Sequence, residues 1–427
     1  MTPVINLFFV PYSFSGVTTY CQALMDYFSR CEKVKMHIVR TSSDKPEFTV
    51  VDRGSVTEIF IPKPSSEIDN QAKYIDQCVL LLYAEFHHLS RIVFHFNMKE
   101  CIDMAKAVSR RFRCKIVYTL HFLESHYSAV KYLGIPMDQI DNRIDIRQQQ
   151  MLALANHIIC VTYFASEIIK DWYGVSLSKI SVIHNGIESI PEHRILSWKE
   201  KEDIKTSLGV QTHERIILYA GRLNRNKGIY CLIRAFKEVV IHFPKSRLII
   251  AGGCSDYDYH KLCKGIYDKV TFAGNLDKET LQSFYKIADV GVVPSHFEQC
   301  SYVAIEMMQF GLPIVVSDLP GLKELFEHRQ NALLCPLRRS ANNLLMVEPD
   351  ISSLGKQIVE LLSNSYLASG LSMHAQKKVR EEFFLIKMGE STLGVYLSSY
   401  NLEKNIGGNT ISYNTTTPGS HHNIPKK

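Results

Sequence analysis

Two glutamates lie eight positions apart in the stretch HFEQCSYVAIEMMQFGLPIVVSD (296–318). Glu298 follows the strand-like run DVGVVPS, whereas Glu306 lies in a segment that is otherwise almost wholly apolar. A carboxylate can accept two hydroxyl groups at once, so Glu306 suits a vicinal diol such as that of a ribose. The ordinary alternative is that Tyr302, Glu306 and Gln309 form the polar face of an amphipathic helix.

A short helix is expected between the two carboxylates and the following strand. Ser301 is a good N-cap for its start, and Gly311 with a following proline predicts its end at about Phe310. The backbone N–H groups of Cys300, Ser301 and Tyr302 would then point outward from the helix N-terminus. Such a terminus favours an anion.

A second group of polar residues follows the strand-like run RIILYA. In AGRLNRNKGIYCLIRAF (220–236), Arg222, Arg225 and Lys227 precede a helix that should start near Gly228. Cations at a helix N-terminus oppose the helix dipole, so the arrangement makes sense if an anion lies between them. A nucleotide diphosphate is the obvious candidate, and a solvated charged loop is the alternative.

Two residues of the N-terminal half also follow strand-like runs. Gly16, after VINLFFV, would let backbone approach a ligand closely, although a strand-to-helix turn alone could need a glycine there. His121 ends VYTLH and His95 ends a neighbouring run; such histidines are more often packing residues than catalytic ones. A dinucleotide-binding GxGxxG is absent from both first turns, so that function is disfavoured.

The elements that must position these residues alternate along the chain. Short β-branched runs are separated by longer amphipathic stretches such as 18–28 and 138–156, which predicts parallel sheets with helical crossovers. The expected strands are 4–10, 36–40, 57–61, 91–96, 115–120, 157–161 and 180–183, then 215–220, 247–251, 269–272, 289–294 and 313–317. The fold class is therefore α/β, with two Rossmann-like doubly wound domains. Ligands of such sheets bind beyond the carboxyl ends of the strands.

Composition is that of a globular chain of more than one core. The 427 residues are 46% hydrophobic and 22% charged, and the net charge of +6 does not suggest a nucleic-acid partner. No apolar run approaches the ~18 residues that span a bilayer, and the N-terminus lacks a basic leader. The eleven cysteines are scattered without metal-like spacing, which predicts free thiols and a cytoplasmic location.

The chain divides into four predicted segments. Residues 1–184 are predicted to form an N-terminal domain, and residues 185–375 a C-terminal domain. Residues 376–400 are expected to be helical, interrupted near Gly389, and to pack back on the first domain, and the polar tail 401–427 is expected to be disordered. The charged run at 198–205 is the expected junction between the domains.

The same residues carry a resemblance to a known family. The chain resembles the retaining glycosyltransferases of family 4, which have two Rossmann-like domains facing a cleft (the GT-B architecture). The likeness covers residues 4–400 and is densest from HNGIE (184–188) through YAGRLNRNKG, LIIAGG, VTFAGNL and ADVGVVPS to FEQCSYVAIEMMQFGLPIVVSDLPGLKEL. The two glutamates match the family's E-x7-E signature.

The resemblance implies a role for each candidate residue. Arg222 and Lys227 would hold the diphosphate of the donor, and Glu306 would hold its ribose. The residues implied to face the donor sugar are Glu298 and the amides of Cys300, Ser301 and Tyr302. Catalysis would rest on Arg222, Lys227, Glu298 and His121.

The resemblance implies three further contacts, and the sequence differs from the usual family pattern at two places. Leu276 would lie near the nucleobase, and Gly16 and His121 would reach the phosphate and the sugar from the first domain. The family usually has Phe-Gly-Leu at 300–302, where this chain has Cys-Ser-Tyr, so the sugar preference is open. A double glycine is also common where this chain has Ser15-Gly16.

The implied activity is transfer of a sugar from a nucleotide-diphosphate sugar to an unidentified glycan, lipid or protein acceptor, with retention of configuration. No metal or other cofactor is expected, because the Asp256–Asp258 pair lies outside the donor motifs. A nucleotide-sugar epimerase or a non-catalytic binding protein on the same fold remain alternatives. The basic run SRRFRCK (109–115) allows peripheral contact with the cytoplasmic membrane face.

Overall fold

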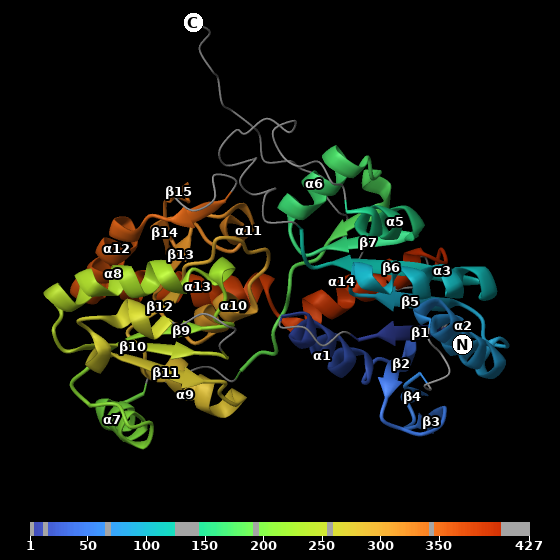
Figure 1. Cartoon of the computed structure of the whole chain (residues 1–427), viewed down its shortest axis with the longest axis horizontal. Coiled ribbons are helices and arrows are strands. Elements are labelled where there is room, and N and C mark those ends of the chain that lie inside the picture. Colours follow the sequence, from blue (N-terminus) through green and yellow to red (C-terminus); the bar gives the residue numbers. More distant parts are fainter. Residues whose placement is uncertain are drawn as a thin grey trace, which may run out of the picture.

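Two α/β units lie side by side in the chain, and Figure 1 shows the first in blue to green and the second in yellow to orange. The structure, a computed structural model, describes residues 4–11, 16–64, 70–123, 145–190, 196–253, 259–340 and 346–402. The predicted disordered tail lies outside these residues, apart from its first two positions. The two-unit architecture confirms the predicted fold class.

The first unit is built on an eight-stranded sheet in which only one pair of neighbouring strands, β3 and β4, is antiparallel. Its strands, in spatial order, are β3 (Thr49–Asp52), β4 (Val56–Pro62), β2 (Val34–Ser43), β1 (Ile5–Val10), β5 (Ile92–Phe96), β6 (Cys114–Leu120), β7 (His157–Cys160) and β8 (Ile180–Val182). The described helices that accompany it are α1 (Gly16–Phe28), α2 (Gln71–Phe86), α3 (Ile102–Arg111), α5 (Ile146–Leu154) and α6 (Tyr163–Tyr173). Central strands such as β5 are buried along their whole length, as β-branched and aromatic runs favour.

The second unit has a six-stranded, wholly parallel sheet. Its order is β11 (Val270–Gly274), β10 (Ser246–Ala251), β9 (Arg215–Ala220), β12 (Val290–Val293), β13 (Ile314–Ser317) and β14 (Leu333–Cys335). A small antiparallel pair, β15 (Leu337–Arg339) and β16 (Val347–Pro349), lies beyond it. The helices are α7 (Trp198–Ser207), α8 (Ile229–His242), α9 (Lys278–Ile287), α10 (Tyr302–Gln309), α11 (Pro320–Lys323), α12 (Ile351–Ser363) and α13 (Ser365–Glu382).

The strand order of each sheet marks where a ligand should bind. In the first sheet β1 lies between β2 and β5, and in the second β9 lies between β10 and β12, so the direction of winding reverses beside β1 and beside β9. Loops diverge at such switch points and leave a crevice beyond the carboxyl ends of the strands. The loops after β9 and β12 therefore flank the crevice of the second unit.

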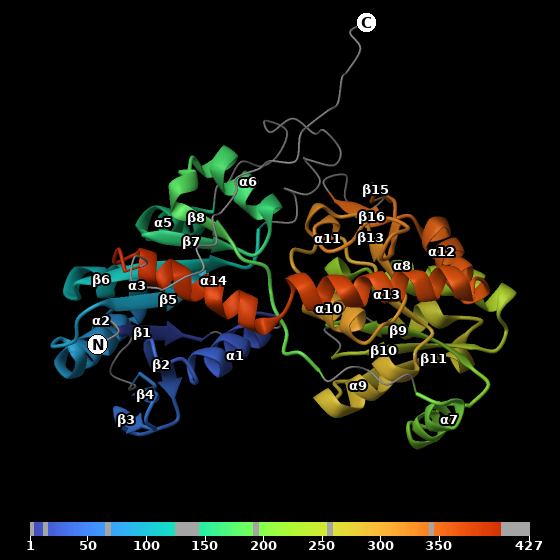
Figure 2. The same cartoon turned by 180° about the vertical axis from the view of Figure 1, so that it is seen from behind.

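The last helix, α14 (Leu385–Ser398), returns to the first unit and packs against α1. Figure 2 shows α13 and α14 following one another along one side of the molecule from the second unit to the first. Residue Ile187 bridges the turn between them: its N–H donates to the carbonyl of Phe383 (3.0 Å), and its carbonyl accepts from Leu385 (2.8 Å). This extended bridge ends α13 at Glu382.

A buried polar chain attaches α14 to the first sheet. The His95 ring contacts the hydroxyl of Tyr396 through Nδ1 (2.6 Å) and the hydroxyl of Thr119 through Nε2 (2.7 Å). The Tyr20 hydroxyl lies 3.1 Å from the same threonine oxygen. Burial lowers the pKa of His95 to about 3, so the ring is neutral and both nitrogens are used. His95 is a packing residue.

Replacing Tyr396 by Phe should lower the free energy of unfolding by about 1–3 kcal/mol, because His95 Nδ1 loses its buried partner. Equilibrium urea unfolding measures the effect. Tyr366 supplies the matched control, because its side chain is 91% exposed and Tyr366→Phe should leave stability unchanged. Equal stability of both variants would contradict the role given to this bond.

Several predicted boundaries were wrong, each for a physical reason. The run at 198–205 is no junction: it forms most of α7, which Ser197 and Glu200 start with a capping box and which packs on α9. Gly389 does not interrupt the tail helix. It lies inside α14, where a Cβ atom would come within 2.5 Å of the Tyr27 ring, so the glycine permits close packing.

Other elements were missed or shifted. The described part of the helix predicted at 138–156 starts at Ile146, after the N-cap Asp145; residues 138–144 lie outside the described residues. The strands β3, β14, β15 and β16 were not predicted, and each has only three or four residues. Runs this short carry too little periodicity to be recognised.

Candidate active site

The loop after β9 presents its cations from a tight turn. Arg225–Lys227 forms a single 3₁₀ turn, and Gly228 follows with φ of 69° and caps α8. A Cβ atom on Gly228 would lie 1.7 Å from the carbonyl oxygen of Pro294, so only glycine fits between this turn and the loop after β12. Gly228 therefore allows the loop after β9 and the loop after β12 to lie in direct contact.

Lys227 and Glu298 form an ion pair across these two loops, with Nζ 2.5 Å from Oε2. The Ser295 hydroxyl donates to the same carboxylate oxygen (3.2 Å). Both charged side chains are largely buried, with 25% and 14% of their surfaces exposed. Each member of this pair can also bind a ligand. Lys227 can donate to a phosphate, and the Glu298 carboxylate can accept from hydroxyl groups.

The helix α10 begins beside this pair. Ser301 caps it by accepting from the N–H of Ala304 (3.4 Å), as its sequence position predicts. Within the described ranges, the buried N–H groups of Cys300, Ser301 and Tyr302 donate to no protein acceptor. An unsatisfied, buried helix N-terminus is suited to an anion, since N–H groups and dipole act together.

Glu306 lies one turn further along α10 and is partly buried. The Tyr285 hydroxyl donates to its Oε2 (2.8 Å), and burial raises the pKa of the carboxyl above its ordinary value of 4.5. One side of the carboxylate is thus held by a tyrosine of α9, while the residue still lines the cavity. Glu306 is therefore not part of a solvated polar face.

His121 and Gly16 bring the first unit to the same place. The amide of Asn97 donates to the carbonyl of Val10 (3.2 Å), so its Oδ1 faces His121 Nε2 at 3.3 Å and accepts from it. Burial lowers the pKa of His121 to about 3, which keeps the ring neutral. The imidazole can thus accept a hydrogen bond at Nδ1 but cannot act as an acid at neutral pH.

A cavity of about 690 Å³ unites these groups between the carboxyl ends of the two sheets. The first unit reaches the second here, since a Cβ atom on Gly16 would lie 3.9 Å from the ring of Tyr302. Every residue to which the family resemblance gives a role lines this cavity: Gly16, His121, Arg222, Lys227, Leu276, Glu298, Cys300, Ser301, Tyr302 and Glu306. Arg225, in contrast, is exposed and is not among the lining residues.

Other lining residues were missed from the sequence. Gly252 and Gly253 follow β10, Asn275 follows β11, and Asn224 and Ser295 lie in the loops that carry Lys227 and Glu298. Gly252 has φ of 145°, and a Cβ atom there would lie 1.9 Å from the carbonyl of Gly221. The rule that ligands bind after parallel strands could have found them, because each follows a strand of the second sheet.

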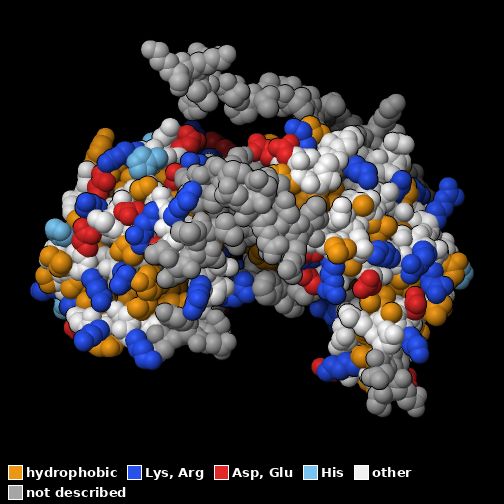
Figure 3. All heavy atoms as spheres, turned by 45° about the horizontal axis from the view of Figure 1, so that its top comes forward, with side chains coloured by type: hydrophobic (Ala, Val, Ile, Leu, Met, Phe, Trp, Pro, Cys, Tyr) orange, Lys and Arg blue, Asp and Glu red, His pale blue; other side chains and the backbone are white. Residues whose placement is uncertain are grey.

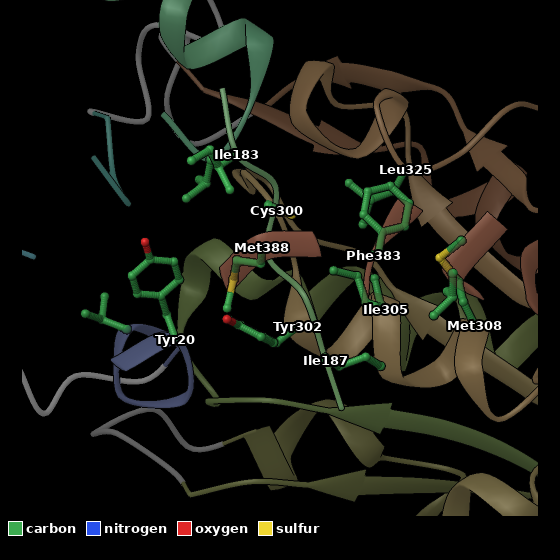
Figure 4. Close-up of a cluster of buried hydrophobic side chains, with 14 of the residues drawn as sticks. Tyr20, Ile183, Ile187, Cys300, Tyr302, Ile305, Met308, Leu325, Phe383 and Met388 are labelled. Atoms are coloured by element: carbon green, nitrogen blue, oxygen red, sulfur yellow. The ribbon is translucent and has the colours of Figure 1, made fainter. Parts of the chain in front are cut away.

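A buried apolar cluster closes the cavity at the seam between the units. Figure 4 shows Tyr20 of α1, Tyr302 of α10 and Met388 of α14 coming together there, beside Ile183 and Ile187 of the linking segment. The Tyr302 hydroxyl is buried and has no hydrogen-bond partner among the described residues. Tyr302 therefore places an unused polar group at the boundary between both units.

The loop that carries Glu298 also bonds directly to the first unit. The hydroxyl of Thr162 donates to Gln299 Oε1 (2.5 Å), and the side-chain amide of Asn185 donates to the carbonyl of Cys300 (2.6 Å). Glu324 of the second unit accepts from the N–H groups of Tyr163 and Phe164, at the start of α6. These bonds cross between segments far apart in the sequence.

The GT-B class of proteins is defined by two α/β units with mainly parallel sheets and a cavity between the carboxyl ends of those sheets. Family models match both halves: Glycosyltransferase Family 4 over residues 14–189 and Glycosyl transferases group 1 over residues 200–378. The chain belongs to the family 4 glycosyltransferases. This confirms the resemblance seen in the sequence.

One curated relative is similar in sequence, and two solved structures share the fold. An uncharacterized glycosyltransferase of Methanocaldococcus jannaschii is 34% identical over 242 residues, which cover 56% of this chain and 59% of that protein. Sucrose-phosphate synthase from Thermosynechococcus elongatus superposes with a TM-score of 0.70 at 19% identity, covering 93% of this chain and 99% of that one. Anabaena HepE in complex with UDP-glucose superposes with a TM-score of 0.66 at 16% identity, covering 92% and 100%. The chain spans between 44% and 66% of the length of the curated relatives it matches.

Proposed function

We propose that this chain transfers a hexosyl group from a nucleotide-diphosphate sugar to an acceptor, with retention of anomeric configuration. The observation that carries the proposal is the wall of the cavity, where the Lys227–Glu298 pair, the free N-terminal amides of α10 and Glu306 follow one another. In this order, these groups suit the sugar, the diphosphate and the ribose of a nucleotide-diphosphate sugar. The fold of HepE, which was solved with UDP-glucose, supports the ligand class.

In the proposed reaction the bond between the sugar C1 and the diphosphate oxygen breaks, and the acceptor oxygen bonds to C1 from the same face. The proton of the acceptor hydroxyl passes to the departing diphosphate oxygen. Lys227 and Arg222 stabilise the negative charge that develops on the departing diphosphate. The carboxylates that line the cavity among the described residues are Glu298 and Glu306, and Glu306 is bonded to Tyr285. They are not a pair flanking a glycosidic bond, as hydrolysis would require.

A thermal-shift screen of nucleotide sugars tests the proposal first. A donor present at one hundred times its dissociation constant adds about 2.7 kcal/mol of stability. Mass spectrometry of the products then separates the alternatives: a glycosylated acceptor supports transfer, an isomerised donor indicates an epimerase, and an unchanged bound donor indicates a binding protein. A chain that binds no nucleotide sugar would refute the proposal.

Turnover should survive a chelator, because cations and helix amides already face the diphosphate position. Magnesium or manganese added after EDTA should not raise the reaction rate. Loss of activity that magnesium or manganese restores would contradict metal-independent transfer. This is the direct measurement of the cofactor requirement.

We also propose peripheral contact with anionic membranes through the basic run at 109–115. Arg110, Arg111 and Arg113 are exposed at the end of α3, and the described helices include none long and apolar enough to cross a bilayer. On the face shown in Figure 3, Lys and Arg side chains are scattered over both units among acidic and apolar ones, so the visible part of that face has no continuous basic patch. The alternative is that the arginines only complement the dipole of α3.

Vesicles with anionic lipid should retain the protein at low salt better than neutral vesicles do, and salt should weaken the retention. Changing Arg110, Arg111 and Arg113 to Ala should abolish the difference. Changing Lys199, Lys201 and Lys237 to Ala is the matched control, because these exposed lysines lie in the second unit. Equal retention on both kinds of vesicle would remove membrane contact from the proposal.

A further inference from the structure

Three metal-ligating side chains meet behind the donor cavity, on elements far apart in the sequence. They are Cys231 of α8, His296 of the loop after β12, and Glu348 of β16, and their ligand atoms all lie within 4.8 Å of one another. The thiol sulfur is 3.8 Å from His296 Nε2. None of the three lines the cavity described above.

Each of these groups is held in place by its surroundings. Cys231 is 0% exposed and Glu348 5% exposed, and His296 is half-buried. Arg338, the register partner of Glu348 across the β15–β16 pair, donates to its Oε1 (2.8 Å). The N–H of His296 donates to the carbonyl of Asn226 (2.8 Å), in the turn that carries Lys227.

Two of the three groups already contact each other. The Cys231 sulfur lies 3.8 Å from His296 Nε2, within reach of a thiol hydrogen bond. The thiol proton can point at Nε2, and that nitrogen then carries a lone pair toward the sulfur. A cation in the centre would take the place of this proton.

We propose that Cys231, His296 and Glu348 bind one divalent ion of the zinc type, with a fourth position open to water. Binding releases the thiol proton to solvent and forms bonds from Sγ, from a ring nitrogen and from a carboxylate oxygen. The thiolate and the carboxylate balance the two charges of the ion. A soft thiolate together with an imidazole selects zinc over magnesium or calcium.

The distance between the sulfur and the ring nitrogen fits such an ion. With metal–sulfur and metal–nitrogen bonds of about 2.3 and 2.0 Å, tetrahedral geometry places sulfur and nitrogen about 3.5 Å apart. The observed 3.8 Å needs only a small contraction. Arg338 on Oε1 acts as the outer partner that orients a ligating carboxylate.

The ion would connect three elements beneath the donor cavity. His296 precedes Glu298 by two residues, and α8 follows directly on the turn of Lys227. Metal bound here would tie both loops of the switch point to the β15–β16 pair. Its role would be to fix the loops, since the ligands do not line the cavity.

Cobalt(II) titration of the metal-stripped full chain tests the site without any substrate. One equivalent per chain should produce a thiolate-to-cobalt charge-transfer absorption with the visible bands of a tetrahedral ion, and zinc should displace it. Thermal unfolding should move to higher temperature with zinc. Cys231→Ser should remove the charge-transfer band and weaken zinc binding by about 100-fold or more.

Cys78→Ser is the matched control, because this thiol is also buried but lies in α2 of the first unit. Its cobalt spectrum should equal that of the wild type. All titrations use a background in which His421 and His422 are replaced by Ala, which removes a histidine pair of the tail. Should Cys231→Ser not fold, His296→Gln must show the same loss of affinity.

A wild-type chain without the charge-transfer band, or a band that persists in Cys231→Ser, would overturn the inference. The outcome is separate from the proposed transfer reaction. A loss of activity in EDTA that only zinc restores belongs to this site, whereas a loss that magnesium restores bears on the donor cavity. The spectrum needs no knowledge of donor or acceptor.

Discussion

Replacing Lys227 by Ala should lower kcat/KM for a nucleotide sugar by about 100- to 1,000-fold. Lys227 forms an ion pair with Glu298 and lines the cavity together with the residues that start α10. In the proposed reaction, the departing diphosphate would gather negative charge there. Removal of one preorganised group that stabilises such charge has an effect of this size. Steady-state kinetics with the donor found by thermal shift provides the measurement.

Arg225→Ala is the matched control for this experiment. Arg225 belongs to the same 3₁₀ turn and has a positive charge, but it is exposed and is not a lining residue of the cavity. Its loss should change kcat/KM by less than about threefold, as expected of a surface charge. If both variants lost the same factor in kcat/KM, the effect would come from the overall positive charge. The specific role proposed for Lys227 would then be wrong.

Glu306→Gln should weaken binding of the nucleoside diphosphate tenfold or more. The change keeps the shape and the bond from Tyr285, but it removes the charge from two proposed bonds to the ribose. Hydrogen bonds to a charged group are each worth about 1.5–3 kcal/mol. Isothermal titration with the nucleoside diphosphate measures the loss.

Glu298→Gln should behave differently, because its proposed partner is the sugar whose bond breaks. Turnover should fall while the nucleoside diphosphate binds nearly as it does to the wild type. The two titrations and the two rates therefore form one comparison. If Glu306→Gln binds the diphosphate like the wild type, the ribose assignment is wrong.

The acidity of Glu306 gives the same comparison a second readout. Burial raises the pKa of its carboxyl above 4.5, and ribose hydroxyl groups bond best to the ionised form. Donor affinity should therefore fall as the pH is lowered through this raised value. Glu306→Gln should lose this part of the pH dependence.

Most of the second sheet could be predicted because its strands are continuous β-branched runs. The two loops of its switch point, which carry Arg222, Lys227 and Glu298 and lead into the helix of Glu306, follow strands that are longer than three residues. Their order along the chain and the rule for parallel sheets suffice to bring them together. The short strand β14 lacked such a run and was missed.

Contacts between residues far apart in the sequence could not be predicted from local sequence patterns. His95 was weighed as a residue at a strand end, but its partner Tyr396 is 301 positions away, and no local pattern connects them. The same holds for Thr162 with Gln299 and for the cluster of Cys231, His296 and Glu348. Cysteine spacing along the chain reveals a metal site only when neighbouring residues supply the ligands.

The bonds from Gln299 to Thr162 and from Cys300 to Asn185 have a kinetic consequence. Both acceptors belong to the loop of Glu298, so a rotation that separates the units must break or strain bonds to that loop. If this loop faces the sugar, as proposed, we expect opening of the molecule and release of the nucleoside diphosphate to share one barrier. The residence time of the product would then depend on bonds that touch neither substrate.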